Sequence, residues 1–247
     1  MSTKQTAMIL AAGKGTRLSE LTKNQPKALV KINGISLLER VIHQLENKGF
    51  QHFVVNVHHF ADQIIDHLKQ TQYQHLKIDI SDERETLLET GGGILNARSY
   101  FAKSEIVLVH NVDILTNLDL KSITDQFEKS GDAAWLVTQD RPSTRKLLFD
   151  KNKQLIGWQH LEKSAFKWVH HPQTNYTELA FSGIHLFRPA LFHKYQTKYC
   201  SIIDLYLEQA KTKDVKSIVI KPDYWFDIGK FAEFQAIENY FTQIETN

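Results

Sequence analysis

A glycine-rich segment near the N-terminus carries the residues best suited to bind phosphate. Gly13 and Gly15 follow a short apolar run, and glycine lets backbone N–H groups approach an anionic ligand closely. Arg17 and Lys27 add two cations, one a planar fork of donors and the other a compact charge. The third glycine of a dinucleotide-binding fingerprint would fall at Leu18, and the Gly-Lys-Ser/Thr ending of a P-loop is absent. The spacing therefore predicts a phosphate site of another kind.

Two aspartates far apart in the sequence are candidate metal ligands. Asp113 comes just after the apolar run 106–109, and ligands of open α/β sheets bind beyond the carboxyl ends of the strands. Asp227 lies in the segment 224–229, before the last expected helix. Two carboxylates, with phosphates and water supplying the remaining oxygens, suit Mg²⁺. We predict a Mg²⁺ site at Asp113 and Asp227, although each aspartate alone fits a turn or helix-capping role equally well.

These elements together resemble the signature of the nucleotide-sugar pyrophosphorylase family, on the motif Ala-Ala-Gly-x-Gly-Thr-Arg-Leu at 11–18 and Pro-Lys-Ala-Leu at 26–29. The resemblance implies a Mg²⁺-dependent sugar-1-phosphate nucleotidyltransferase whose substrates are an NTP and a sugar 1-phosphate. It assigns catalysis to Arg17, Lys27, Asp113 and Asp227. It assigns nucleotide binding to Ala11, Ala12, Gly13, Gly15, Thr16, Glu83, Glu89 and Gly91. The family usually has glycine before the metal-binding aspartate, whereas this chain has Val112.

Three consecutive glycines at 91–93 are hard to justify by propensity, so a ligand or another part of the chain must come close to that backbone. The segment 88–94 resembles the turn with which the family reads the nucleobase, although a flexible connector is the alternative. The sequence of this segment most resembles that of family members that use UTP and N-acetylmuramate α-1-phosphate. The reaction of those members belongs to peptidoglycan recycling and cell-wall metabolism.

The sugar end of the site is less distinct in the sequence. Ser182 and Gly183 resemble a family turn that contacts the sugar, although a strand bulge would explain them almost as well. Lys163 follows Glu162 as in the Glu-Lys-Pro element of related thymidylyltransferases, but Ser164 stands in place of the proline. We predict Lys163, Ser182 and Gly183 as substrate-binding residues.

The expected chemistry requires no nucleophilic side chain. A phosphate monoester has a second pKa of about 6, so a sugar 1-phosphate is largely dianionic at neutral pH and attacks without a general base. Catalysis then consists mainly of positioning two polyanions and stabilising their charge. The histidine pairs at 58–59 and 170–171 have neither helical spacing nor a nearby cysteine, which argues against a zinc site.

Apolar β-branched runs alternate with amphipathic helical stretches through the first half of the chain, which predicts a mostly parallel sheet covered by helices. The expected fold is an α/β, Rossmann-like three-layer sandwich with a small mixed-sheet substrate region. We expect one domain over 1–247, with 1–138 mainly binding nucleotide and 139–247 mainly binding sugar phosphate. The predicted strands are 6–10, 52–57, 76–80, 106–109, 133–138, 146–149, 155–158, 180–187 and 216–220, and the predicted helices are 37–48, 61–69, 94–100, 120–129, 202–210 and 231–240.

The composition limits the partners. Thirty basic and 28 acidic residues leave a net charge of +2, too little for the basic face that duplex binding requires, so no nucleic-acid partner is expected. No apolar run approaches the length of a membrane span, so no membrane partner is expected. A single cysteine, Cys200, fits a reducing compartment, and we expect a cytoplasmic protein. The oligomeric state is not readable from the sequence.

Three other functions fit parts of the pattern. A heptose or hexose 1-phosphate guanylyltransferase would use the same machinery. A GT-A-like glycosyltransferase could share the α/β half, and 111–113 loosely resembles its Asp-x-Asp motif, but it releases no pyrophosphate for Arg17 and Lys27 to bind. A nucleotide-sugar sensor would bind ligand without turnover.

Overall fold

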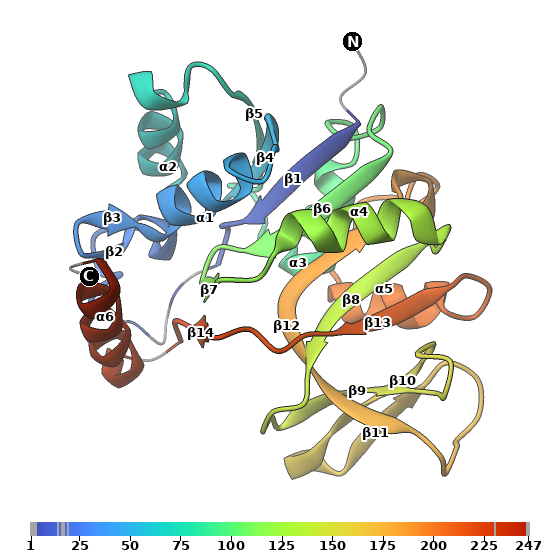
Figure 1. Ribbon diagram of the computed structural model, residues 1–247. Coiled ribbons are helices and arrows are strands. Elements are labelled where there is room, and N and C mark those ends of the chain that lie inside the picture. Colours follow the sequence, from blue (N-terminus) through green and yellow to red (C-terminus); the bar gives the residue numbers. More distant parts are fainter. Residues whose placement is uncertain (1–3, 14, 16–17, 19, 230, 246–247) are drawn as a thin grey trace.

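The centre of the computed structural model is a parallel sheet that carries the first half of the chain (Figure 1). The structure describes residues 4–13, 15, 18, 20–229 and 231–245. Four neighbouring parallel strands run in the order β5-β4-β1-β6. They are β1 (Gln5–Leu10), β4 (His52–Val57), β5 (Lys77–Asp82) and β6 (Ile106–Asn111).

A long strand, β12 (Thr177–Phe187), continues this sheet into the second half of the chain. Its C-terminal part pairs antiparallel with β6, and its N-terminal part pairs antiparallel with β9 (Arg145–Phe149). β8 (Ala134–Gln139) also pairs with β12, and β13 (Val215–Val219) pairs parallel with β8. Beyond β12 an antiparallel extension of three strands is formed by β9 (Arg145–Phe149), β10 (Leu155–His160) and β11 (Ala165–Trp168). The expected mixed-sheet region is this extension.

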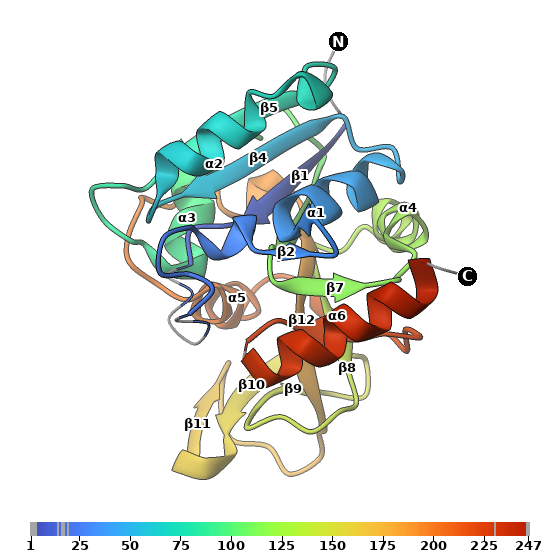
Figure 2. The same ribbon diagram turned by 90° about the vertical axis from the view of Figure 1, so that its left-hand side faces the viewer.

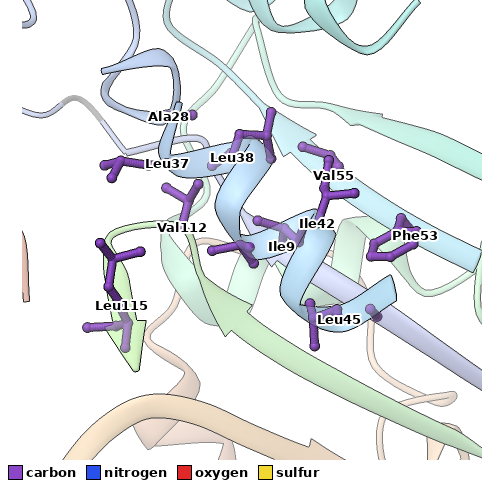
Figure 3. Packing of buried hydrophobic residues seen from close by; sticks show 14 of the residues in the cluster. Ile9, Ala28, Leu37, Leu38, Ile42, Leu45, Phe53, Val55, Val112 and Leu115 are labelled. Carbon is purple, nitrogen blue, oxygen red and sulfur yellow. The ribbon is translucent and has the colours of Figure 1, made fainter. Parts of the chain in front are cut away.

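Helices cover both faces of the sheet, because successive strand residues point to opposite sides. Ile9, Phe53 and Val55 belong to one buried cluster, whereas Met8 and Val54 belong to another on the opposite face. The first cluster is closed by α1 (Leu37–Glu46), α2 (Ala61–Leu68), α4 (Leu120–Ser130) and α6 (Phe231–Glu245), and part of it is shown in Figure 3. The second is closed by α3 (Glu89–Ala97) and α5 (Ile202–Gln209). The predicted three-layer α/β fold is confirmed.

Local signals explain where the helices begin and end. The Ser36 hydroxyl accepts a hydrogen bond from the Glu39 N–H at 3.1 Å and caps α1. Asp119 caps α4 through the Ser122 N–H at 3.3 Å, and Gly131 ends that helix in the left-handed conformation. None of the helices in the described part of the chain is long and apolar enough to cross a membrane.

Two short antiparallel pairs of strands were not predicted. The first joins β2 (Lys31–Ile32) to β3 (Ile35–Ser36) just before α1. The second joins β7 (Ile114–Thr116) to β14 (Trp225–Asp227), two segments more than a hundred residues apart. Figure 2 shows α6 on the same side of the molecule as α1 and β7. The second pair matters for the site because it begins next to Asp113.

The prediction of a helix over 94–100 was wrong at its start. α3 begins at Glu89, so the three glycines lie inside the helix rather than between a strand and a helix. A β-carbon on Gly92 would lie 2.4 Å from the Lys198 carbonyl oxygen, and one on Gly91 would lie 2.8 Å from the Ser201 backbone. Close packing against the segment before α5 therefore requires glycine and outweighs its low helix propensity.

Candidate functional site

A cleft of about 390 Å³ lies at the carboxyl ends of the parallel strands. Residues after β1, β4, β5 and β6 form its floor, and the starts of α3, α5 and β9 complete its walls. The lining residues are Leu10, Ala12, Gly13, Asn56, Glu83, Leu87, Glu89, Thr90, Asn111, Asp113, Arg145 and Ser201. Five of them, Ala12, Gly13, Glu83, Glu89 and Asp113, are residues that the sequence predicted. The structure thus brings residues of the glycine-rich loop, the predicted base-binding segment and the predicted metal site into one cleft.

Asn56, at the end of β4, ties the glycine-rich loop to the predicted base end of the cleft. Its side-chain oxygen accepts hydrogen bonds from the backbone N–H groups of Ala11 at 2.7 Å and Ala12 at 3.3 Å. Its amide nitrogen donates to Glu83 Oε1 at 2.7 Å. Asn56 and Glu83 are both 3% exposed, so these contacts are shielded from water. One amide side chain therefore fixes the loop backbone and a buried carboxylate together.

Glu83 has an unusual environment for a carboxylate. Burial raises its pKa, while hydrogen bonds from Asn56 and from the Leu88 N–H partly oppose that rise. Its neighbours lie close around it, because a β-carbon on Gly93 would lie 2.8 Å from Glu83 Oε1. The carboxylate is thus held by residues of β4 and α3.

Lys27 and Asp113 form an ion pair inside the site. Lys27 Nζ lies 2.5 Å from Asp113 Oδ2, and the side chains are 8% and 23% exposed. Lys27 opens a 3₁₀ turn, Lys27–Leu29, directly after Pro26, whose fixed φ suits the position before such a turn. The structure therefore joins a predicted phosphate cation to a predicted metal ligand.

The second predicted metal ligand lies next to the first. Asp227 is opposite Ile114 in the β7–β14 pair, and the Ile228 N–H donates to the Asp113 carbonyl oxygen at 2.9 Å. Asp227 is thus a strand residue rather than the cap of a helix. The two carboxylates form an all-oxygen donor set. No group of three or more His, Cys, Asp or Glu that could hold a metal occurs among the described residues.

Val112, the departure from the family pattern, does not line the cleft. Its side chain is 4% exposed and belongs to the buried cluster that contains Ile9 and Leu37 (Figure 3). Its N–H donates to the Leu10 carbonyl oxygen at 3.2 Å. The valine therefore packs into the core and leaves the approach to Asp113 open.

The glycine-rich loop is described only in part. Gly15 has a φ of +63°, and a β-carbon there would lie 3.0 Å from Thr22 and 3.1 Å from Lys27 Cβ. Glycine is therefore required both by the backbone conformation and by the approach of Lys27. The predicted residues Thr16 and Arg17 lie outside the described residues.

Of the two predicted residues at the start of α3, Glu89 lines the cleft and Gly91 does not. Glu89 lines the cleft with a φ of +61°, which is rare for a residue with a side chain, and its Oε1 accepts a hydrogen bond from the Tyr199 hydroxyl at 2.9 Å. Gly91 is not among the lining residues, and its N–H donates to the Cys200 carbonyl oxygen at 2.9 Å. The contacts of the glycines are thus with the segment before α5.

The residues predicted for the sugar are not among the lining residues of the cleft. The Ser182 hydroxyl is fully buried and donates to the Val137 carbonyl oxygen at 2.7 Å. Gly183 has a φ of +78° at a register shift of β12, and a β-carbon there would lie 2.8 Å from Ile114. Lys163 is exposed in a 3₁₀ turn after β10. The bulge that the sequence left open as an alternative for Ser182 and Gly183 is present.

Sequence reasoning did not select several residues of the cleft. Asn111 is the last residue of β6 and Asn56 is the last but one of β4, and their place at the carboxyl end of a parallel strand was the available signal for them. Arg145 and Ser201 come from the second half of the chain, and no local motif marks them. They reach the cleft only through the pairing of β9 with β12 and the packing of α5.

His110 lies beside this site but inside the sheet. It is fully buried, its Nδ1 donates to the Asn111 carbonyl oxygen at 2.8 Å, and burial lowers its pKa to about 4. It is therefore neutral at pH 7.

Comparisons with known proteins bear on the family and the fold of the chain. The sequence profile of a family described as nucleotidyl transferase matches residues 6–244. N-acetylmuramate alpha-1-phosphate uridylyltransferase of Caulobacter vibrioides is 44% identical over 109 residues, which cover 43% of this chain and 45% of that enzyme. The bifunctional protein GlmU of Methanococcus aeolicus is 29% identical over 231 residues, which cover 91% of this chain and 51% of that protein. The chain thus spans about half the length of these two relatives.

Two further proteins resemble the chain over nearly all of their own length. UTP–glucose-1-phosphate uridylyltransferase AglF of Haloferax volcanii is 27% identical over 237 residues, which cover 90% of each protein. The crystal structure of HddC from Yersinia pseudotuberculosis, complexed with GMP-PN, superposes with a TM-score of 0.74 at 24% identity. That superposition covers 96% of this chain and 99% of the other, and it supports the fold.

Proposed function

Because the chain belongs to the nucleotidyl transferase family, we propose that it transfers a uridylyl group from UTP to N-acetylmuramate α-1-phosphate or a related hexose derivative. The products would be the UDP-sugar and pyrophosphate. The observation that carries the proposal is the cleft in which Asp113, paired with Lys27 and adjacent to Asp227, lies between the Asn56–Glu83 end and the wall formed by β9. The uridylyl group and the sugar rest on the relative that is 44% identical over part of the chain.

The proposed reaction is a direct displacement at the α-phosphorus of the nucleotide. An oxygen of the sugar phosphate forms the new bond, the bond between the α-phosphorus and the bridging oxygen breaks, and pyrophosphate leaves with the electron pair. The sugar phosphate is dianionic near neutral pH, so no side chain has to remove a proton. The task of the chain is to hold two polyanions in line and to stabilise their charge.

Particular residues serve these tasks in the proposal. Asn56 holds the backbone of Ala11 and Ala12 at the phosphate end, as its hydrogen bonds indicate. Lys27 supplies a buried positive charge beside Asp113, where its interaction with phosphate is weakly screened. Arg17, on the loop, is expected to bind the leaving pyrophosphate.

Mg²⁺ fits the donor set of Asp113 and Asp227. Both donors are carboxylate oxygens, which Mg²⁺ prefers, and the β7–β14 pairing holds the two residues together. When bound, the ion would neutralise phosphate charge. Lys27, beside Asp113, would supply a further positive charge to the phosphates.

Pyrophosphate release tests the proposal directly. The protein is incubated with Mg²⁺, each of UTP, GTP, CTP and dTTP, and a panel of sugar 1-phosphates that includes N-acetylmuramate, N-acetylglucosamine, glucose, mannose and heptose. The greatest release is expected with UTP and N-acetylmuramate α-1-phosphate. Preference for GTP with a heptose or hexose phosphate would replace this proposal with the guanylyltransferase, and no release with any pair would refute nucleotidyl transfer.

Variants separate turnover from binding. Asp113→Asn and Asp227→Asn should each lower kcat by at least about 100-fold while nucleotide binding is partly kept, because the loss falls on charge stabilisation. Asp66→Asn, an exposed aspartate on α2, is the matched control and should keep full turnover. Full turnover in both site variants would contradict the assignment, and a trapped nucleotidyl–enzyme adduct would exclude direct displacement.

A further inference from the structure

Arg145 is a cation in the cleft that none of the tasks above uses. It is the first residue of β9, its side chain is exposed, and it lines the same cleft as Asp113 and Glu89. Its backbone is fixed on both sides, because its N–H donates to Ser143 Oγ at 3.3 Å and its carbonyl accepts from that hydroxyl at 2.9 Å. Within the described part of the chain, its guanidinium has no hydrogen-bond or ion-pair partner. The fork of donors is therefore available to a ligand.

The surrounding charges make this arginine distinctive. The other ionisable residues that line the cleft in the described structure are carboxylates, namely Glu83, Glu89 and Asp113. Arg141, four residues earlier, stacks on Trp225 at 4.0 Å and donates to the Phe181 carbonyl oxygen at 3.0 Å. Burial lowers its pKa and the nearby Asp227 carboxylate opposes that fall, so Arg141 belongs to the Asp227 end of the site. Among the described residues that line the cleft, Arg145 is the one arginine or lysine.

The position of Arg145 argues against contact with the reacting phosphates. β9 is separated from β6, which carries Asp113 at its end, by the intervening strand β12. β9 pairs with residues 177–179 of β12 and β6 with residues 184–187, so the separation includes a step along β12 in addition to two strand spacings of roughly 5 Å each. The phosphates would lie near Asp113 and Lys27, and a sugar attached through C1 would extend away from them toward β9. A group on the far side of the sugar ring would then meet the guanidinium.

We propose that Arg145 binds a carboxylate carried by the sugar and that the substrate class is an acidic sugar 1-phosphate. A guanidinium matches a carboxylate with two parallel N–H···O bonds, which no neutral sugar hydroxyl reproduces. The inference rests on the proposed function and deepens it. N-acetylmuramate carries a lactyl carboxylate on its ring, whereas N-acetylglucosamine is the same ring without that group, so the pair isolates the contact.

The test compares these two sugar 1-phosphates, with UTP and Mg²⁺, in the native protein and in Arg145→Ala. The native protein should prefer the acidic sugar, and Arg145→Ala should lower kcat/KM for it by about 100-fold, the usual effect of losing a charged hydrogen-bonded pair. The value for the N-acetylglucosamine compound should change by less than about threefold. Arg145→Lys should recover part of the loss, because it keeps the charge but not the fork.

Lys151→Ala is the matched control, since it removes an exposed positive charge from the turn after β9 and should leave both substrates unaffected. An equal loss for both sugars in Arg145→Ala would overturn the inference and assign the arginine to the phosphate. Equal use of both sugars by the native protein would also overturn it, while leaving nucleotidyl transfer intact. No turnover of either sugar would overturn the proposed substrate and this inference together.

Discussion

Replacing Asn56 by alanine should strongly destabilise the protein, because this side chain serves three hydrogen-bond partners in a buried site. The change leaves the Ala11 N–H and Glu83 Oε1 without the groups that lie 2.7 Å from each of them. An unsatisfied buried group costs about 1–3 kcal/mol, and the small cavity adds to this, so the free energy of unfolding should fall by about 3–5 kcal/mol. Urea unfolding followed by circular dichroism measures the difference.

The loss of unfolding free energy in the Asn56→Ala variant, called the deficit below, should also depend on pH. The pKa of Glu83 is raised by burial, so its contribution to stability is present below the ordinary value of 4.5 and is lost as the pH rises through the folded pKa. The hydrogen bond from Asn56 opposes that rise, so its removal should make the loss larger. The deficit should therefore be greater at pH 7.5 than at pH 4.5, and it should lose this dependence in a Glu83→Gln background.

Asn96→Ala provides the control, because Asn96 on α3 makes only long, partly exposed contacts to Ser81 and Asp82 and should cost less than about 1 kcal/mol. A deficit for Asn56→Ala no larger than that of Asn96→Ala would refute the bridging role. A deficit that is equal at both pH values would refute the coupling to Glu83.

Three further outcomes follow from other parts of the molecule. Gly92→Ala should lower the free energy of unfolding by about 2 kcal/mol or more, since its β-carbon would lie 2.4 Å from the Lys198 carbonyl oxygen. Gly13→Ala is the control, because its β-carbon would meet no atom within 4 Å, and it should leave the urea midpoint unchanged. Arg188→Ala should lower the free energy of unfolding in urea by about 2 kcal/mol without changing kcat. The reason is that the guanidinium donates to the carbonyl oxygens of Phe127, Glu128 and Asp132 around the end of α4. A lowered kcat at unchanged stability would contradict this expectation. Burial lowers the pKa of His110 to about 4 and that of His185 to about 3. Both histidines therefore contribute stability above pH 6.5 that is lost as the pH falls toward 4. The free energy of unfolding of His185→Gln should fall less steeply over this pH range than that of His59→Gln, in which an exposed histidine is replaced as a control.

The sequence predicted best those elements whose local pattern and tertiary surroundings agree. β4 matches its predicted bounds, because it contains a run of β-branched and aromatic residues and all six of its residues are buried. The start of α1 also matches, because Ser36 is a good cap before an amphipathic run. Asp113 could be found from its place after such a strand, with no knowledge of its partners.

The remaining features depend on contacts that no local pattern records. In the sequence, the glycines of α3 suggest a loop, because the backbone of 198–201 that packs against them is distant in the chain. β7 and β14 are three residues each and form only because each supplies the other's hydrogen-bond partners. Arg145 is one arginine among many in the sequence, and only the path of β12 brings it to the cleft.

The pairing of β7 with β14 has a consequence for how the protein is made. Asp113 is synthesised in the first half of the chain, but its neighbour Asp227 and the strand that holds it are synthesised near the end. β6 also lacks its neighbour β12 at that stage, so the β6 edge of the sheet in a nascent chain stays unpaired until residues 177–187 leave the ribosome. An incomplete chain therefore has the predicted phosphate-binding residues but only one of the two aspartates, and the β7–β14 pair that places the two aspartates next to each other forms only once synthesis has passed Asp227.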